Sequence, residues 1–246
     1  MDYFAAARAQ LSLEYGCQPS DFLQNENVLT TSFLHPQRRR YGNRPHFFQM
    51  VSFGRCAVLT ADPLLHPFLK EFMEISPGYE LFYQPNLWLL QKELLKYNYS
   101  LAESYHMFLP KHDVLPQKDF SVKWFFDDEI DIFRNDARFS NALTMPKNPL
   151  RPDRIAVAAY DGDTLMGLAG CSEDADHWLQ IGIDVLESYR GQGVASHLVT
   201  LLKNRILLDA NIPFYGTTLS NYASWHTALS AGFTPAFIEQ AAFPFC

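Results

Sequence analysis

The sequence predicts a mixed α/β fold class, and three observations support this. Hydrophobic residues make up 48% of the 246 residues and charged residues 19%, a balance typical of chains that bury a large core. Short apolar runs of strand length alternate with segments that have helical periodicity. In the last hundred residues a strand, a glycine-rich loop, a helix, a second strand and a second helix follow one another, which is typical of an α/β layer.

The charge balance argues against a nucleic-acid-binding surface. The net charge is −7, and the one basic run, Arg38 to Arg40 with Arg44, is interpreted as a solvated loop before a strand. No apolar stretch approaches the roughly 18 residues of a membrane span, and the first residues lack the apolar core of a secretory signal. We therefore expect a cytoplasmic protein, monomeric or homodimeric, with no nucleic-acid or membrane partner.

The pattern of the N-terminal part of the sequence predicts a smaller α/β domain. Prolines and charges replace the apolar pattern at 110–119, which predicts a boundary between an N-terminal domain, 1–118, and a C-terminal domain, 119–246. The elements expected before the boundary are strands at 47–53 and 56–61 joined by a hairpin, helices at 63–75 and 86–97, and one strand over 99–110.

In the C-terminal part the predicted strands and helices are easier to distinguish. Asp161, Gly162 and Asp163 predict a tight hairpin turn between two apolar strands. The expected elements are strands at 120–126, 154–160, 164–172, 177–185 and 212–219, a helix at 127–139, a long helix after the glycine loop to residue 210, and a helix at 221–231 that ends at Gly232.

Gly191 and Gly193 stand at the threshold of the long helix, although glycine disfavours helices. Backbone N–H groups of such a loop at a helix N-terminus form a cradle for an anion, and Arg190 adds a charged donor. The alternative is an ordinary turn that needs glycine only for a positive φ. The dinucleotide pattern G-x-G-x-x-G fails at Ser196, and the pattern G-x-x-x-x-G-K-[ST] is absent.

Two motifs in this part resemble those of a known superfamily. Arg190, Gly193 and Ala195 match the pattern [RQ]-x-x-G-x-[GA], which resembles the acetyl-CoA pyrophosphate motif of the GNAT N-acetyltransferases. Asn221 and Ser224, followed by a helix that ends in Gly-Phe, resemble the second CoA motif of that superfamily. The resemblance covers about residues 119–240, and the whole chain is most similar to two-domain bacterial members of the zwittermicin-resistance-like group. It implies a mixed, mostly antiparallel sheet flanked by helices, and acetyl-CoA as the acyl donor.

The resemblance also implies roles for individual residues. The main chain near Ile183 and Val185 would pair with the pantetheine arm and polarise the thioester, and the glycine loop would receive the pyrophosphate. Core packing for these strand residues and a helix N-cap for Asn221 are compatible alternatives. The cofactor-binding residues implied are Ile183, Val185, Arg190, Gly191, Gln192, Gly193, Val194, Ala195, Asn221 and Ser224.

The catalytic residues are less well determined by the sequence. Many relatives carry a tyrosine acid where this chain has Ala228, so that role is unfilled or passes to another residue. His177 and Asp184 are candidate general bases. A solvent-facing histidine and a carboxylate that caps the glycine loop are the alternatives. No metal site is expected, because no histidine pair has metal-ligand spacing.

The sequence therefore predicts an acetyl-CoA-dependent N-acetyltransferase that transfers acetyl to a primary amine of a small molecule. Transfer would be direct, in a ternary complex, because the spacing places no base beside Cys171. A CoA-binding sensor or interaction module without activity is the alternative, suggested by Ala228. A nucleotide-binding protein that uses the same cradle is a third possibility.

Overall fold

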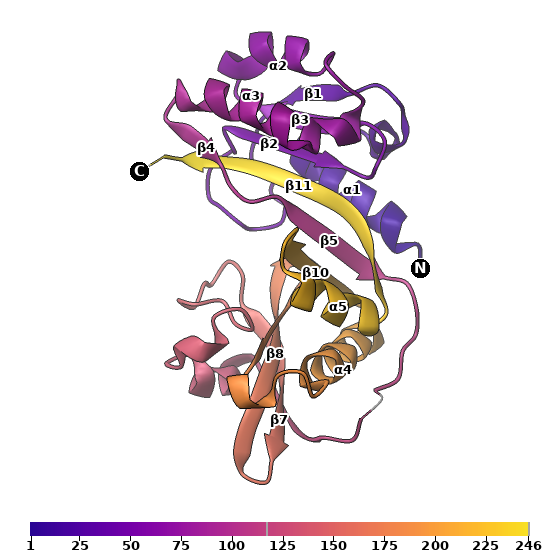
Figure 1. Ribbon diagram of the computed structural model, residues 1–246, viewed down its shortest axis with the longest axis vertical. Helices are drawn as coiled ribbons and strands as arrows, with labels where there is room; N and C mark the ends of the chain where they lie inside the picture. Colours follow the sequence, from indigo (N-terminus) through magenta and orange to yellow (C-terminus); the bar gives the residue numbers. More distant parts are fainter. Residues whose placement is uncertain (117, 246) are drawn as a thin grey trace. The chain divides into compact units, whose positions relative to one another are not determined.

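The computed structural model describes residues 1–116 and 118–245, which form two compact units (Figure 1). Unit 1 consists of residues 1–38, residues 42–107 and the residues from 236 on. Unit 2 consists of residues 39–41 and 108–235. The boundaries fall inside β5 (Tyr105–Pro110) and β11 (Phe233–Pro244), so both strands contribute to both units.

Unit 1 is a small sheet with helices. In it β3 pairs antiparallel with β2 and parallel with β1, while β11 pairs antiparallel with both β2 and β4. Leu59, Leu69 and Leu90 belong to one fully buried apolar cluster between sheet and helices. The elements are α1 (Tyr3–Tyr15), β1 (Val28–Thr31), β2 (Phe48–Ser52), β3 (Ala57–Ala61), α2 (His66–Phe72), α3 (Gln84–Leu95) and β4 (Tyr99–Leu101).

Unit 2 is built on a mostly antiparallel sheet, so the predicted fold class is confirmed. The strands β6, β7, β8 and β9 pair antiparallel in chain order, and β10 then pairs parallel with β9. The elements are β6 (Ser121–Phe126), β7 (Asp153–Asp161), β8 (Thr164–Ala175), β9 (Trp178–Val185), α4 (Val194–Leu208), β10 (Ile212–Thr218) and α5 (Tyr222–Ser230).

The two faces of this sheet bury different residues of the same strand. Ile155 and Val157 of β7 pack into the cluster that includes Leu198 of α4, whereas Ala156 and Ala158 pack against short helices on the other face. This follows from the alternation of side chains along a strand. Figure 1 shows α4 and α5 together on one side of the β7–β8 hairpin.

Several predicted elements differ from the structure. The helix expected at 127–139 is instead two 3₁₀ helices, η4 (Asp127–Phe133) and η5 (Ala137–Phe139), which place Ile130, Phe133 and Phe139 in one buried cluster. The strand expected over 99–110 is interrupted between β4 and β5, where Gln240 binds the Ala102 carbonyl. The helix α1 and the strand β1 were not predicted.

Among the described residues, no helix is long and apolar enough to cross a membrane.

Candidate functional site

A cavity of about 500 Å³ opens where the C-terminal end of β9, the N-terminus of α4 and the helix α5 meet. This volume is within the usual range for small-molecule sites. The candidate base Asp184 and the unpredicted Tyr189 and Tyr215 also line it. The residues predicted from the CoA motifs that line it are Ile183, Val185, Arg190, Gly191, Gly193, Val194, Ala195, Asn221 and Ser224.

Two parallel strands separate at this cavity. The pairing of β9 with β10 runs from Trp178 and Ile212 to Ile181 and Tyr215 and stops there. Both strands continue, β9 to Val185 and β10 to Thr218. The edge of β9 at residues 183–185 therefore has backbone groups that are not used in a ladder with β10, and backbone groups of this kind require a hydrogen-bonding partner.

The glycine loop has the conformation that the anion cradle needs. Gly191 and Gly193 have φ values of 74° and 85°, and Gly193 is the N-cap of α4. A Cβ atom on Gly191 would meet nothing within 4 Å, so the loop is open beside it. The first N–H groups of a helix lack intrahelical partners and carry partial positive charge. These residues therefore fit a pyrophosphate group.

Two side chains of the loop bind the main chain of neighbouring residues. Arg190 Nε donates to the Val185 carbonyl oxygen at 3.2 Å, which places its guanidinium between the glycine loop and the free edge of β9. Gln192 Nε2 donates to the Ser188 carbonyl oxygen at 3.0 Å, and Gln192 does not line the cavity. Of these two predicted cofactor-binding residues, only Arg190 thus lines the cavity.

Asn221 and Ser224 lie at the start of α5. The side chain of Asn221 is the N-cap, because its Oδ1 accepts a hydrogen bond from the Ser224 N–H at 3.2 Å. Its Nδ2 donates to no acceptor among the residues that the structure describes, so it stays available to a ligand in the cavity. The N-cap role expected as an alternative is present and does not exclude ligand binding.

A buried tyrosine completes this wall of the cavity. Tyr215 Oη and Ser224 Oγ are 2.5 Å apart, a short hydrogen bond between hydroxyl groups. Burial raises the pKa of Tyr215, although the bond to Ser224 opposes the shift, so the phenol stays protonated at neutral pH. Ala228, the position of the expected tyrosine acid, is fully buried and has no functional group. Tyr215 was missed because it reads as an ordinary core residue of a strand.

Asp184 anchors a turn next to the cavity. Its carboxylate accepts hydrogen bonds from the Asn141 N–H, the Asn141 side-chain amide and the Ala142 N–H at 2.7–2.8 Å. Three donors thus occupy the oxygens of this candidate base. Asp184 does cap a loop, but it is the turn at residues 139–143, which we call the Asn141 turn, and not the glycine loop.

The Asn141 turn lies directly on the sheet because two glycines face each other there. Gly170 of β8 and Gly182 of β9 are paired residues of the ladder. A Cβ on Gly182 would come within 1.9 Å of the Asn141 carbonyl oxygen, and one on Gly170 within 2.4 Å of the Ala142 oxygen. Such distances are far below van der Waals contact, so only glycine permits this approach.

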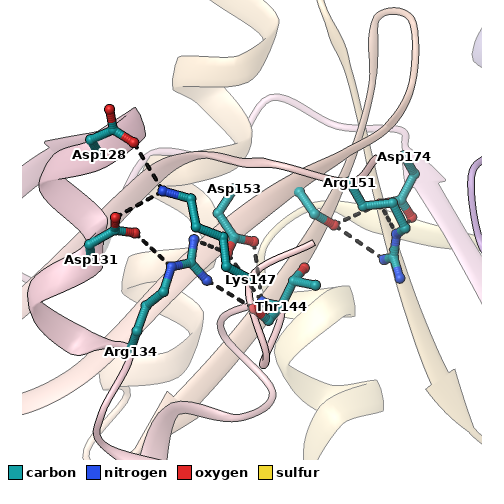
Figure 2. Close-up of polar contacts among 9 residues, drawn as sticks. Asp128, Asp131, Arg134, Thr144, Lys147, Arg151, Asp153 and Asp174 are labelled. Carbon is teal, nitrogen blue, oxygen red and sulfur yellow. Dashed lines mark hydrogen bonds and ion pairs between the residues drawn. The ribbon is translucent and has the colours of Figure 1, made fainter. Parts of the chain in front are cut away.

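A network of charged residues fixes the chain on both sides of this turn (Figure 2). Arg134 binds Asp131 at 2.6 Å and the buried Asp153 at 2.9 Å, and it donates to the Thr144 carbonyl oxygen at 2.9 Å. The Asp153 carboxylate in turn accepts from the Thr144 N–H at 3.2 Å. The segment after the turn is thereby tied to β7.

A second, buried ion pair continues the network. Arg151 binds Asp174 through two nitrogens, at 2.9 and 3.2 Å, and the Asp174 side chain is fully buried (Figure 2). The Asp174 carbonyl oxygen accepts from the Arg40 N–H at 2.7 Å, and the Arg151 guanidinium lies 4.7 Å from the Tyr41 ring centre. Residues 39–41 join unit 2 through these contacts.

His177 is not part of this cavity. It precedes Trp178 at the opposite end of β9, has a φ of 67° and binds Asn211 through Nδ1 at 3.0 Å. About six residues of strand separate it from Ile183, which is roughly 20 Å at 3.3 Å per residue. The structure therefore does not bring His177 together with the other predicted site residues. Among the residues described, no group of histidines, cysteines or carboxylates is arranged to hold a metal ion.

A comparison with known protein families identifies the family of the domain that contains this cavity. Residues 115–233 match the family model described as the acetyltransferase (GNAT) family. These residues are a GNAT acetyltransferase domain. The match includes the separated ends of β9 and β10, the glycine loop and α5. The predicted GNAT acetyltransferase is therefore confirmed for this part of the chain, and acetyl transfer is the general chemistry of the family.

Solved structures similar to this chain have low sequence identity to it. An acetyltransferase of the GNAT family from Colwellia psychrerythraea is 17% identical over 63% of this chain and 62% of its own, with a TM-score of 0.43. A GCN5-related N-acetyltransferase from Kribbella flavida is 12% identical over 99% and 96%, with a TM-score of 0.47. A Salmonella typhimurium protein solved with its cofactor acetyl-CoA is 13% identical over 51% and 94%, with a TM-score of 0.36.

The chain thus spans less than two thirds of the Colwellia protein. No protein of curated function matches the sequence significantly.

Proposed function

We propose that this protein is an acetyl-CoA-dependent N-acetyltransferase that acts on a primary amine of a small molecule. The observation that carries the proposal is the cavity in which the glycine loop, the free edge of β9 and the start of α5 meet. Backbone donors, one arginine and a buried phenol converge there, which is what a phosphorylated thioester donor requires.

Acetyl-CoA supplies the acetyl group as a thioester, and the neutral amine nitrogen bonds to the acetyl carbon as the carbon–sulfur bond breaks. The nitrogen loses one proton to solvent, and the sulfur leaves as a thiolate that takes up one proton. The N–H groups of the glycine loop and Arg190 would hold the pyrophosphate, and the main chain of Ile183 and Val185 would hold the pantetheine arm and polarise the thioester carbonyl. Asn221 Nδ2 would donate to the arm. Cys171, fully buried in the core, has its thiol pKa raised by burial, which supports direct transfer without a cysteine intermediate.

Tyr215 and Ser224 would supply the proton that the leaving sulfur accepts. Both line the cavity, both are hydroxyl groups, and burial keeps the phenol protonated. A proton that leaves Ser224 Oγ toward the sulfur can be replaced from Tyr215 Oη across the 2.5 Å bond, or the two can exchange roles. This pair would take over the task for which Ala228 has no functional group.

The Asn141 turn would form the wall that faces the acceptor amine, because Asp184 connects it directly to the cavity. We keep the predicted division into an acetyltransferase domain, residues 119–246, and an N-terminal domain of unknown role, residues 1–118, although the compact units divide the chain after residues 107 and 235. The 15% aromatic content favours a walled small-molecule pocket over a groove for a protein tail.

The direct test is release of CoA from acetyl-CoA in the presence of a panel of primary amines, with each amine omitted in turn as the control. Turnover with at least one small amine is expected. Tight binding of acetyl-CoA without CoA release across a broad panel would contradict the enzyme proposal. It would favour a CoA-binding module without activity, which the apolar Ala228 position already makes the second candidate.

The hydroxyl pair is tested by Tyr215→Phe and Ser224→Ala in that assay. Loss of an acid typically lowers turnover by about 10²-fold or more, so we expect at least one variant to lower kcat strongly, and Tyr215→Phe to leave the Kd for acetyl-CoA unchanged. The basic limb of the pH profile should also shift. A normal kcat in both variants would remove this pair from the mechanism.

A further inference from the structure

A lysine from outside the glycine loop lies against it. Lys118 Nζ donates a hydrogen bond to the main-chain oxygen of Gln192, the residue between the two loop glycines. A Cβ on Gly193 would lie 3.3 Å from Lys118 Cε and 3.4 Å from Nζ. The ammonium group therefore lies beside Gly193, the N-cap residue of α4, whose neighbours Gly191 and Val194 line the cavity.

The segment before this lysine is tied along α4. We call residues 111–116 together with Lys118 the strap. At its start the N–H groups of Lys111 and His112 donate to the Gly232 carbonyl oxygen at 2.9 and 3.1 Å. Further on, Asn204 Nδ2 of α4 donates to the Val114 carbonyl oxygen at 3.0 Å. The strap thus runs from the end of α5 across the surface of α4.

A buried lysine holds the first part of the strap. Lys203 is fully buried, and its Nζ donates to the His112 carbonyl oxygen at 2.9 Å. A Cβ on Gly232 would come within 2.5 Å of that same oxygen, and Gly232 has a φ of 84°. Gly232, the glycine that ends the second CoA motif, is therefore also the residue against which the start of the strap packs. A buried cation with a specific partner indicates that the position of the strap is specified.

The distances show why Lys118 arrives at the glycine loop. From Asn204 back to Gly193 the helix rises eleven residues, about 16 Å at 1.5 Å per residue. Four residues from Val114 to Lys118 span at most about 14 Å when extended. Lys118 Nζ reaches Gln192 because the long lysine side chain adds to the reach of the backbone beyond Val114. Its ammonium is thereby delivered to one place, the N-terminal end of α4.

We propose that Lys118 is a phosphate ligand of the acyl donor, presented to the glycine loop by the strap. The Gln192 carbonyl holds the ammonium beside Gly193, where a phosphate oxygen would accept a stronger, charge-assisted hydrogen bond. Lys118 and Arg190 then flank the helix N-terminus from different segments of the chain. This inference rests on the proposed function, because it assigns a ligand to the phosphate site of that function.

The test is calorimetric titration of Lys118→Gln, which keeps the side-chain length and removes the charge. Two probes are used, acetyl-CoA and S-acetylpantetheine, which has the same thioester arm but no phosphate. We expect acetyl-CoA to bind about three- to tenfold more weakly at low salt, with a smaller loss at high salt. S-acetylpantetheine should bind equally to both proteins. Lys118→Arg should retain most of the affinity, and Lys111→Gln, at the far end of the strap, should match the unchanged protein.

Three results would overturn the proposal. Equal affinity of Lys118→Gln and unchanged protein for acetyl-CoA would remove the contact. Equal weakening for both probes would show that Lys118 only supports the loop. Failure of the unchanged protein to bind acetyl-CoA would refute the proposed function itself, and with it this assignment, so the two failures are distinguishable.

Discussion

Two parts of the site are built in different ways: the cofactor wall of the cavity, and the Asn141 turn, which we propose as the second wall and which Asp184 connects to the cavity. The cofactor wall consists of backbone groups at the glycine loop and at the free edge of β9, and its geometry depends on positive φ angles at Gly191 and Gly193. The Asn141 turn is held by side chains, namely the Asp184 carboxylate and, through Thr144, the ion-paired Arg134. A wall made of backbone restricts the residue type at a few single positions. A wall held by charges requires that two residues far apart in the sequence keep complementary side chains.

The largest effect is expected from breaking the buried ion pair of Arg151 and Asp174 in unit 2. Arg151→Met leaves the fully buried Asp174 carboxylate without its cation, and loss of one partner of a buried pair costs about 3–5 kcal/mol. Urea unfolding should show this loss, while the folded fraction keeps its affinity for acetyl-CoA.

The matched control replaces both charges, Arg151→Met with Asp174→Leu. An apolar pair of similar volume often restores stability, so the double variant should be clearly more stable than the single one. A single variant as stable as the unchanged protein would show that this ion pair does not stabilise unit 2.

The next effect separates ligand binding from the fold at the cofactor wall. Gly193→Asp places a side chain and a negative charge at the helix N-terminus beside the phosphate site. We expect at least a tenfold loss of acetyl-CoA affinity, on the order of 1.4 kcal/mol, measured by calorimetric titration of the folded variant.

Gly162→Asp serves as the matched control. Gly162 also has a positive φ, 58°, and a Cβ there would meet nothing within 4 Å, but it lies in the β7–β8 turn away from the cavity. It should lower the melting temperature by a similar amount without changing affinity. If both variants bind acetyl-CoA equally well, the loop glycines serve only the turn.

A smaller effect is expected from Arg190→Ala. Its guanidinium is exposed and already binds the Val185 carbonyl oxygen, so its loss should weaken acetyl-CoA binding by less than Gly193→Asp does. The difference from the unchanged protein should shrink between low and high salt, since exposed charges are screened. Arg138→Ala, which removes an exposed arginine paired with Asp136, is the control. A salt-independent loss would contradict an electrostatic role.

The smallest effect concerns pH and the Asn141 wall. Hydrogen bonds from Lys147 and Arg134 lower the pKa of Asp131. A carboxyl with a lowered folded-state pKa stabilises the protein above its ordinary pKa of about 4, and this contribution is lost as the pH falls through the folded value. The unchanged protein should therefore lose slightly more stability than Asp131→Asn between about pH 4 and pH 2 in thermal unfolding.

Asp153 binds the same arginine, but its pKa shift is opposite to that of Asp131, because burial raises the pKa of Asp153. Its carboxylate gives no stability that acid would remove, so the acid-sensitive part of the network should disappear with Asp131 alone. Identical acid profiles of the two proteins would contradict this assignment.

The contrast between the walls also explains what the sequence could predict. Gly191 and Gly193 are required by backbone conformation, so the loop, the start of α4 and the cap at Asn221 could be located from local patterns. Asp184 could be singled out, but its partner Asn141 is 43 residues away, and no local pattern specifies that pairing. The same holds for Lys118, which lies 74 residues before Gln192.

The secondary structure shows the same limit. The segment at 127–139 has the acidic start and apolar spacing of a helix, and the structure uses these residues in two 3₁₀ turns that place Phe133 and Phe139 in the core. Tertiary packing decided between the two geometries. Gly170 and Gly182 are visible in the sequence as glycines in strands, but only the folded chain reveals that the Asn141 turn crosses them.

The facing pair of Gly170 and Gly182 has a consequence for how this protein could acquire a new acceptor. Backbone oxygens of the turn occupy the positions where side chains at these two residues would lie. Even a methyl group, the smallest possible side chain, exceeds the space there, so neither glycine can be replaced without moving the turn. Changes of specificity should therefore accumulate in the side chains that the turn carries on its outer surface. Under the proposed function, the pair of glycines would fix the depth of the acceptor site beside the Asn141 turn and leave only its lining free to vary.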